Sequence, residues 1–142
     1  MRYLDTSVLL AFLVTEEGSS AAEALMTSDG APLGISTWTE VELMSALGVK
    51  IRSKQLSERE ALSVVDVYRR RVLPCLRRVH VGEVAHRRAA GLLDGWRTAL
   101  RAGDGLHLAI ADSHRATIYT FDHGMAKAGA ILGIAVSLVE IT

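Results

Sequence analysis

The stretch from Gly103 to Asp122 (GDGLHLAIADSHRATIYTFD) constrains the fold of this chain more than any other part of the sequence. Residues 106–111 are apolar except for His107, and this pattern predicts a buried helix that begins at Asp104. Residues 116–121 are mainly β-branched and aromatic, which predicts a strand that ends just before Asp122. A carboxylate directly after a buried strand lies at the edge of a sheet, where open α/β folds bind their ligands.

The N-terminus repeats this arrangement of a strand followed by an acid. Residues 1–4 (MRYL) predict a short strand, Asp5 follows it directly, and an apolar helix is predicted over residues 8–14 (VLLAFLV). The chain therefore carries three acids at the ends of predicted elements.

Two further helices carry a start signal of the capping-box type, in which Ser or Thr precedes Glu by three residues. Thr37 and Glu40 form the first pair, which opens a helix that continues to residue 51. Ser57 and Glu60 form the second pair, which opens a helix over residues 58–73. The first pair provides a structural explanation for Glu40.

The other patterns complete an alternation of strands and helices. Helices are predicted over residues 19–26, 83–93 and 123–132, and strands over residues 33–36, 76–81 and 134–139. Gly133 is expected to end the last helix in a left-handed conformation. This order predicts a single three-layer α/β/α domain, residues 1–142, with a central and mainly parallel sheet.

Length and composition exclude several classes of protein. A chain of 142 residues with 49% hydrophobic residues can bury a core unaided and is not disordered. No apolar run approaches the roughly 20 residues that span a bilayer, so we expect no membrane association. A single cysteine, Cys75, permits no internal disulfide, and we expect a cytoplasmic protein. Arg2 followed by residues 8–14 resembles a signal peptide, but Asp5 and the pair Glu16–Glu17 oppose that alternative.

The net charge is zero, yet the two signs are separated along the chain. Residues 50–101 hold thirteen of the sixteen Lys and Arg residues but only five of the acids. This separation predicts a basic face suited to a polyanion and an acidic pocket elsewhere. The alternative is that the arginines belong to ordinary solvated helix faces. They are clustered as Arg69, Arg70, Arg71, Arg77, Arg78, Arg87 and Arg88.

Four acids are candidates for the acidic pocket: Asp5, Glu42, Asp104 and Asp122. Glu42 belongs with them because its helical neighbours are apolar or small, so its carboxylate is either exposed or directed into a pocket. Carboxylates that are brought together repel one another, and a cation is expected among them. Mg²⁺ or Mn²⁺ suits such oxygens, and one or two such ions can activate a water and stabilise the leaving oxygen of a phosphodiester. The alternative for each single acid is a partner of a helix dipole.

Four segments of the chain resemble motifs of the PIN-domain ribonucleases, specifically the small VapC-like toxins of bacterial toxin–antitoxin pairs. They are LDTSVLLAFL (4–13), STWTEVELMSAL (36–47), GDGLHLAIA (103–111) and TFDHGMAKAGAILGIAV (120–136). Their order and spacing are similar to the family's over nearly the whole chain. One departure is Gly105, where the family more often has alanine, and it bears on the stability of that helix.

The resemblance implies a PIN-like fold and a Mg²⁺- or Mn²⁺-dependent endoribonuclease. It implies that Asp5, Asp104 and Asp122 bind the metal, that Glu42 completes the catalytic set, and that Ser7 is a supporting hydroxyl. It further implies an RNA substrate and a cognate antitoxin, and a homodimer is expected. We expect the RNA to bind over the basic segment, at Arg69, Arg70, Arg71, Arg87 and Arg88.

Four other residues are candidates for a role, each with a structural alternative. His107 is either a general base or, as we favour, an internal histidine hydrogen-bonded within the fold. Asp112 lies two helical turns beyond Asp104 and is expected to be a surface acid. Trp38 is expected to pack in the core rather than to stack on a base. Trp96 is either an anchor of a dimer or a stacking platform for RNA.

Three other functional classes compete with the nuclease. A receiver-like regulatory domain also gathers acids at a sheet edge, but it would need a lysine at the end of a late strand, and Lys127 lies in a predicted helix. A dehalogenase-like phosphatase would need a second aspartate at the position of Ser7. A binding-only relative, whose acids serve only to dock a partner, is the third alternative.

Overall fold

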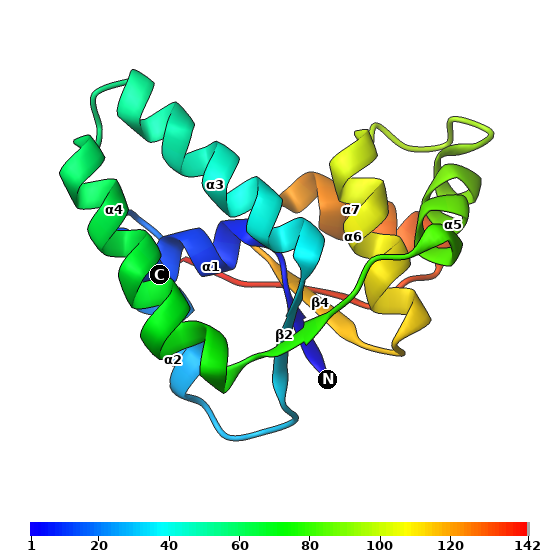
Figure 1. Ribbon diagram of the computed structural model, residues 1–142. Coiled ribbons are helices and arrows are strands. Elements are labelled where there is room, and N and C mark those ends of the chain that lie inside the picture. The colour runs from blue at the N-terminus through cyan, green and yellow to red at the C-terminus, as the bar shows by residue number, and fades with distance from the viewer. Residues whose placement is uncertain (142) are drawn as a thin grey trace.

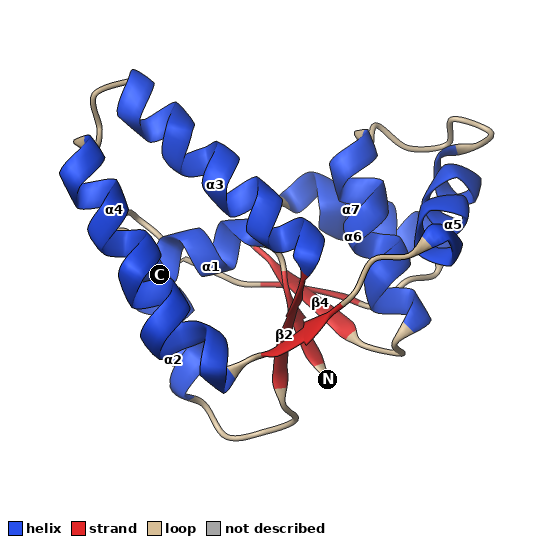
Figure 2. Ribbon diagram, in the orientation of Figure 1, coloured by secondary structure: helices blue, strands red, loops and turns tan. Residues whose placement is uncertain are grey.

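The computed structural model describes residues 1–141, and at the centre of this region lies a five-stranded sheet (Figures 1 and 2). Every neighbouring pair of strands is parallel, in the order β3-β2-β1-β4-β5. The strands are β1 (Arg2–Leu4), β2 (Leu33–Ser36), β3 (Arg77–Val79), β4 (Thr117–Thr120) and β5 (Val136–Leu138). The predicted parallel α/β sheet is therefore confirmed.

Helices cover both faces of the sheet and make the three layers that the element order predicted. They are α1 (Thr6–Leu13), α2 (Ser19–Thr27), α3 (Thr37–Arg52), α4 (Glu58–Val67), α5 (Glu83–Leu93), α6 (Ala102–Ser113) and α7 (His123–Leu132). Successive strand residues point to opposite faces. Tyr3 packs with buried residues of α5, α6 and α7, whereas Leu4 packs with those of α1, α2 and α3. Within residues 1–141, no helix is both long and apolar enough to cross a bilayer.

The strand order reverses at β1, and this reversal places the site. From β1 the chain passes to β2 and β3 on one side, and β4 and β5 lie on the other side. Open α/β sheets bind ligands outside the carboxyl ends of the strands at such a reversal, which here lies between β1 and β4. Asp5 directly follows β1, and Asp122 directly precedes the first residue of α7 just beyond β4. Both acids therefore lie at the expected position.

The start of α4 was predicted correctly. Ser57 Oγ accepts a hydrogen bond from the backbone N–H of Glu60 (3.1 Å), and Glu60 Oε1 accepts one from the backbone N–H of Ser57 (3.0 Å). The two groups form the reciprocal capping box that their spacing predicted.

The predicted capping box of Thr37 and Glu40 is wrong, because α3 is capped by Ser36 and Thr39 instead. Ser36 Oγ accepts from the backbone N–H of Thr39 (3.2 Å), and Thr39 Oγ1 accepts from that of Ser36 (3.1 Å). Ser36 is the last residue of β2 and is fully buried, so its hydroxyl can satisfy a helix N–H that water cannot reach. Glu40 instead accepts hydrogen bonds from Tyr68 and Arg78.

The helix predicted over residues 58–73 has the expected extent but not a uniform geometry. After Val67 it continues as a π-helical segment, Tyr68–Val72, and then as a short 3-10 turn. Tyr68 and Val72 are buried against the core of α1 and α3, and the three arginines between them are exposed.

Two glycines have specific reasons for their identity. Gly133 ends α7 with φ of 73°, the left-handed conformation that the sequence predicted. Gly105 lies on α6 where a Cβ atom would come within 3.1 Å of the Leu93 side chain on α5. Its departure from the family pattern therefore has a packing reason, since α5 approaches α6 closely at this point.

Candidate functional site

Asp5 is the most deeply buried acid of the site, with 6% of its surface exposed. Its Oδ2 accepts hydrogen bonds from Ser7 Oγ (2.7 Å) and from Thr120 Oγ1 at the end of β4 (2.8 Å). Asp5 occupies the position before α1, yet its side chain makes no capping hydrogen bond. The helix-cap alternative therefore does not explain why a carboxylate is buried here.

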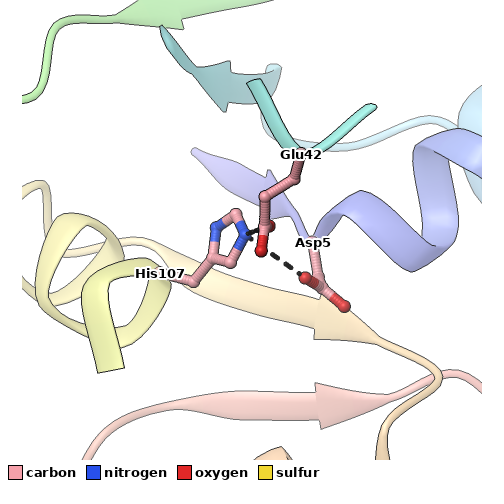
Figure 3. Close-up of side chains that lie close together, drawn as sticks. All are labelled: Asp5, Glu42 and His107. Carbon is pink, nitrogen blue, oxygen red and sulfur yellow. Dashed lines mark hydrogen bonds and ion pairs between the residues drawn. The ribbon is translucent and has the colours of Figure 1, made fainter. Parts of the chain in front are cut away.

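Glu42 points into the same site from the second turn of α3 (Figure 3). Its Oε1 accepts a hydrogen bond from Thr6 Oγ1 (2.7 Å) and another from His107 Nε2. Burial by itself would raise the pKa of Glu42, but the hydrogen bond and charge of His107 and the Thr6 hydroxyl together lower that pKa below its ordinary value. Glu42 is therefore a half-buried carboxylate held by Thr6 and His107, not an exposed surface acid.

His107 is fully buried on α6 and connects Glu42 to the core. Because a carboxylate only accepts, Nε2–H donates to Glu42. Nδ1 lies 2.8 Å from the Tyr3 hydroxyl, to which it donates in the charged ring and from which it accepts in the neutral ring. The Tyr3 oxygen also lies 2.7 Å from Ser36 Oγ. Both ring nitrogens thus have partners within the fold, which confirms the internal histidine that the sequence favoured over a general base.

The first turn of α6 approaches Glu42 at Gly103. A Cβ atom on Gly103 would lie 3.0 Å from Glu42 Oε2 and 3.3 Å from the Trp38 ring. Trp38 is partly buried against the core, and its Nε1–H donates to the Gly103 carbonyl (3.3 Å). The predicted packing role of Trp38 is confirmed, and the absence of a side chain at Gly103 leaves room for the acids.

Asp104 is half-buried in the first turn of α6, as the sequence predicted. Burial, followed by the negative charges of Asp5 and Asp122, raises the pKa of Asp104 to about 6, although the charge of His107 opposes this shift. A pKa that is raised by neighbouring acids indicates that these acids repel one another across the site.

Asp122 is the exposed member of the set and has a structural role as well. Its Oδ1 accepts from the backbone N–H groups of Gly124 (2.8 Å) and Met125 (3.4 Å), and it caps α7. The helix-cap explanation therefore applies to Asp122, whereas Asp5 and Glu42 need another one. Its second oxygen, Oδ2, makes no hydrogen bond within residues 1–141.

The structure brings part of the predicted acidic set into close contact. Asp5, Glu42 and His107 each offer an atom to a group in which all atoms lie within 4.8 Å of one another (Figure 3). Asp104 and Asp122 lie outside this group. The charges of Asp5, Asp122 and Glu42 nevertheless act on Asp104 and raise its pKa. Because the His107 nitrogens already have hydrogen-bond partners, the atoms available to coordinate a metal are carboxylate oxygens. These are the ligands that Mg²⁺ and Mn²⁺ prefer. The residues present therefore fit a hard divalent cation.

Replacing Asp104 by Asn is expected to stabilise the metal-free protein at neutral pH. The folded-state pKa of Asp104, about 6, lies above the ordinary value, so the metal-free protein loses stability as the pH rises through about 6. Asn cannot ionise, and allowing for solvent screening of a half-exposed group we expect a gain of about 1 kcal/mol, or about 3 °C in Tm. Thermal melts in EDTA at pH 8 and pH 5 measure it. A lower Tm for the Asn variant at pH 8 would identify Asp104 as a structural acid.

The five arginines of the predicted RNA path are exposed but do not form one face. Arg69, Arg70 and Arg71 lie in the π-helical segment over one face of the sheet, whereas Arg87 and Arg88 lie on α5 over the other. Several already have acidic partners: Arg70 pairs with Asp66, Arg87 with Glu83, and Arg88 with Asp112. The Arg88 pair places Asp112 at the surface, as predicted.

Sequence reasoning missed the polar residues that hold the acids in place. These residues are Tyr3, Thr6 and Thr120. The contact of His107 with Glu42 was missed as well. Some signals were present, since His107 is the only polar residue within the apolar run of α6 and lies three residues after Asp104. Thr120 directly precedes Phe121 and Asp122 at the end of a strand, where a hydroxyl can face an acid on the next strand.

The sequence of residues 2–131 matches the model of a protein family described as the PIN domain. No protein of curated function matches the chain significantly.

Three solved structures have a similar fold. The FitAcB structure from Neisseria gonorrhoeae has a TM-score of 0.77 at 22% identity, over 96% of each chain. VapC20 from Mycobacterium tuberculosis, described as a toxin that cleaves the sarcin-ricin loop, has a TM-score of 0.72 at 19% identity, over 91% of this chain and 95% of that one. A toxin–antitoxin complex from Klebsiella pneumoniae has a TM-score of 0.65 at 17% identity, over 100% of each chain. At these identities the likeness shows the fold alone.

Proposed function

Because this chain belongs to the PIN-domain family of nucleases, we propose that it is a divalent-metal-dependent endoribonuclease and the toxin of a toxin–antitoxin pair. Family membership excludes the receiver-like and dehalogenase-like alternatives. The binding-only alternative is distinguished from the nuclease by the experiment below.

The observation that carries this proposal is the environment of the Asp5 carboxylate. It is buried at the carboxyl end of the central strand, where two hydroxyls donate to one of its oxygens. Within residues 1–141 its only ion-pair partner is His107, at 3.5 Å, and that ring also binds Glu42. A buried carboxylate without a strong counter-charge is costly, and the cost is removed when a cation binds.

We assign Asp5, Asp104 and Asp122 as the residues that would hold the ion, with Glu42 beside them. When bound, Mg²⁺ or Mn²⁺ lowers the pKa of water and stabilises charge on a phosphodiester. Ser7 and Thr120 orient Asp5 through their hydroxyls, and the contact with His107 keeps Glu42 ionised and directed into the site. Proton removal from the attacking water is assigned to this carboxylate set.

The exposed arginines support an RNA substrate by charge. Within residues 1–141, Arg69 and Arg71 form no salt bridge, so both are free to contact phosphates of the RNA. To do the same, Arg70, Arg87 and Arg88 would each have to give up a salt bridge with an acidic side chain. Arg69→Ala should therefore reduce the salt dependence of RNA binding, by roughly 0.7 in slope for each phosphate that the side chain neutralises. An unchanged slope would assign Arg69 to the solvated surface.

An antitoxin partner is proposed from the family and from the related complex of a toxin with its antitoxin. The helices α1 and α3 offer apolar surface for such a partner or for a homodimer, including the exposed Val41 and Val49 on α3. A cytoplasmic location is consistent with the single free cysteine. Co-expression with an antitoxin that forms a complex with this protein should inhibit cleavage, and uninhibited cleavage by that complex would contradict this pairing.

The proposed function predicts metal-dependent RNA cleavage that leaves 5′-phosphate and 3′-hydroxyl ends. A pool of short RNAs is incubated with the pure protein while Mg²⁺ or Mn²⁺ is titrated, and EDTA is expected to abolish cleavage. The ends follow from attack by water rather than by the ribose hydroxyl.

Cyclic 2′,3′-phosphate ends, or cleavage that persists in EDTA, would show a different mechanism. Binding of RNA and metal without any cleavage would favour the binding-only relative.

A further inference from the structure

Trp96 is a large apolar side chain in an unusual position. It is 87% exposed, more than any other large hydrophobic residue of the described chain, residues 1–141. Its own backbone is left-handed, with φ of 53°, which is a rare conformation for a bulky residue. An aromatic ring held in solvent on a disfavoured backbone needs an explanation, because residues of this kind cluster at functional sites.

The local turn does not provide that explanation. The backbone N–H of Trp96 donates to the Leu93 carbonyl (3.2 Å) and closes a turn at the end of α5. Asp94 has φ −64° and ψ 137° and Gly95 has φ 88°, as in a type II turn, in which the third residue is commonly glycine. The turn thus accounts for Gly95, but it does not require a left-handed backbone at Trp96.

Trp96 lines a cavity of about 290 Å³ between the α5–α6 loop and α7. The other walls include Arg97, Thr98, Gly124, Lys127 and Ile131. The loop is joined to α7 by the Arg97 guanidinium, which donates to the Ile131 carbonyl (3.3 Å). This volume is at the small end for ligand pockets and suits one flat ring system better than an extended ligand.

The cavity is adjacent to the acidic site. Gly124, which lines the cavity, donates its backbone N–H to Asp122 Oδ1 at 2.8 Å. The loop that carries Trp96 leads into α6, on which Asp104 lies in the first turn. A chain of nucleotides with a phosphate at the acids would therefore have its neighbouring nucleotide within reach of the cavity.

We propose that Trp96 and this cavity bind one unpaired base of the RNA, stacked on the indole ring, with the adjoining phosphate facing Arg97 and Lys127. The subsite rests on the proposed function and deepens it, because it adds a binding site for one base beside the acidic site. Bases stack on aromatic side chains in single-strand binding proteins with little regard to sequence.

The charge of the cavity favours a nucleotide over a protein anchor. Arg97 and Lys127 are both exposed, and neither forms a salt bridge within the part of the chain described here. Two cations beside an exposed ring suit a base with its phosphate, whereas the centre of a protein interface is typically depleted of Lys.

The test measures binding, so that it does not depend on cleavage. The full-length protein in EDTA is titrated into a fluorescein-labelled oligoadenylate of about twelve nucleotides and, in parallel, into an abasic strand of the same length. Trp96→Ala is expected to weaken binding of oligoadenylate about five- to 150-fold and to leave binding of the abasic strand nearly unchanged. Trp96→Phe should retain most of the affinity. Trp96→Gly should behave like Trp96→Ala while accepting the left-handed backbone, so a folding defect cannot imitate the result.

The matched control is Leu62→Ala, which removes another exposed apolar side chain from α4, at the opposite end of the molecule (Figure 1). It should leave both affinities unchanged. An equal loss for both strands, or no loss for either, would overturn the proposal. Unchanged RNA affinity with an altered molar mass in light scattering would show that Trp96 is a protein contact instead. The Trp96 variants could lose affinity for oligoadenylate as expected while the wild-type protein fails to cleave RNA in the metal titration. In that case this subsite would stand and the nuclease assignment would fail.

Discussion

Replacing Asp5 by Asn is expected to lower the rate of RNA cleavage at least about 100-fold, the scale expected when a group that positions a catalytic metal is lost. The amide removes the negative charge at the most buried acid of the site. It also disturbs the hydroxyls of Ser7 and Thr120, which in the wild-type protein both donate to Asp5 Oδ2. Single-turnover cleavage in saturating Mn²⁺ measures the effect.

Replacing Asp104 by Asn should reduce the cleavage rate on a similar scale. The melting temperature of this variant separates an effect on stability from an effect on catalysis. Asp104→Asn should melt higher than the wild type without metal, because the repulsion that raises the pKa of this group is removed. A variant that is more stable but inactive cannot owe its inactivity to unfolding.

Asp112→Asn is the matched control, since it is an acid on the same helix whose carboxylate pairs with Arg88 at the surface. Its cleavage rate should stay within about twofold of the wild type because exposed pairs contribute little. If all three variants lose activity equally, the acids act through the general charge of the protein and not through a metal site.

Replacing His107 by Ala is expected to destabilise the fold by about 3–5 kcal/mol, because it removes one partner from a buried, charged hydrogen-bond network. The Glu42 carboxylate would lose its hydrogen bond from His107, and the Tyr3 hydroxyl would lose one of its three hydrogen-bond partners. A Tm lower by about 10 °C or more should result, measured by thermal denaturation.

Two variants calibrate this prediction. His80→Ala removes an exposed histidine and should leave Tm nearly unchanged. Tyr3→Phe removes one hydroxyl from the same network and should cost about 1–2 kcal/mol, since Ser36 and Thr39 keep each other as partners. A loss below about 1 kcal/mol for His107→Ala would mean that water replaces the ring and that the network does not hold Glu42.

The overall architecture could be predicted because its signals are local. The buried helix of residues 106–111 and the strand after it follow from the order of apolar residues along a few turns of chain, and the structure confirms both. Asp5 and Asp122 were placed at the sheet edge because each follows a strand, and the carboxyl ends of parallel strands meet at one edge. The Ser57 capping box is equally local, and it was correct.

The cap of α3 shows where local reasoning reaches its limit. Thr37 and Glu40 have the right spacing, but Ser36 and Thr39 form the box. The choice depends on burial and on competition for Glu40, whose carboxylate binds Tyr68 and Arg78, 28 and 38 residues away. Spacing alone cannot include partners that arrive only when the chain has folded.

The sequence by itself determined which residues carry the chemistry: carboxylates after β1 and β4, an acid in the first turn of α6, and one on α3 with no local partner. Only the tertiary structure decided how they are held. The contact between Glu42 and His107 spans 65 residues and that between Asp5 and Thr120 spans 115. The physical reason is that hydrogen bonds between distant segments depend on strand order and helix packing. These also decide the burial and the neighbouring charges that lower the pKa of Glu42 and raise that of Asp104.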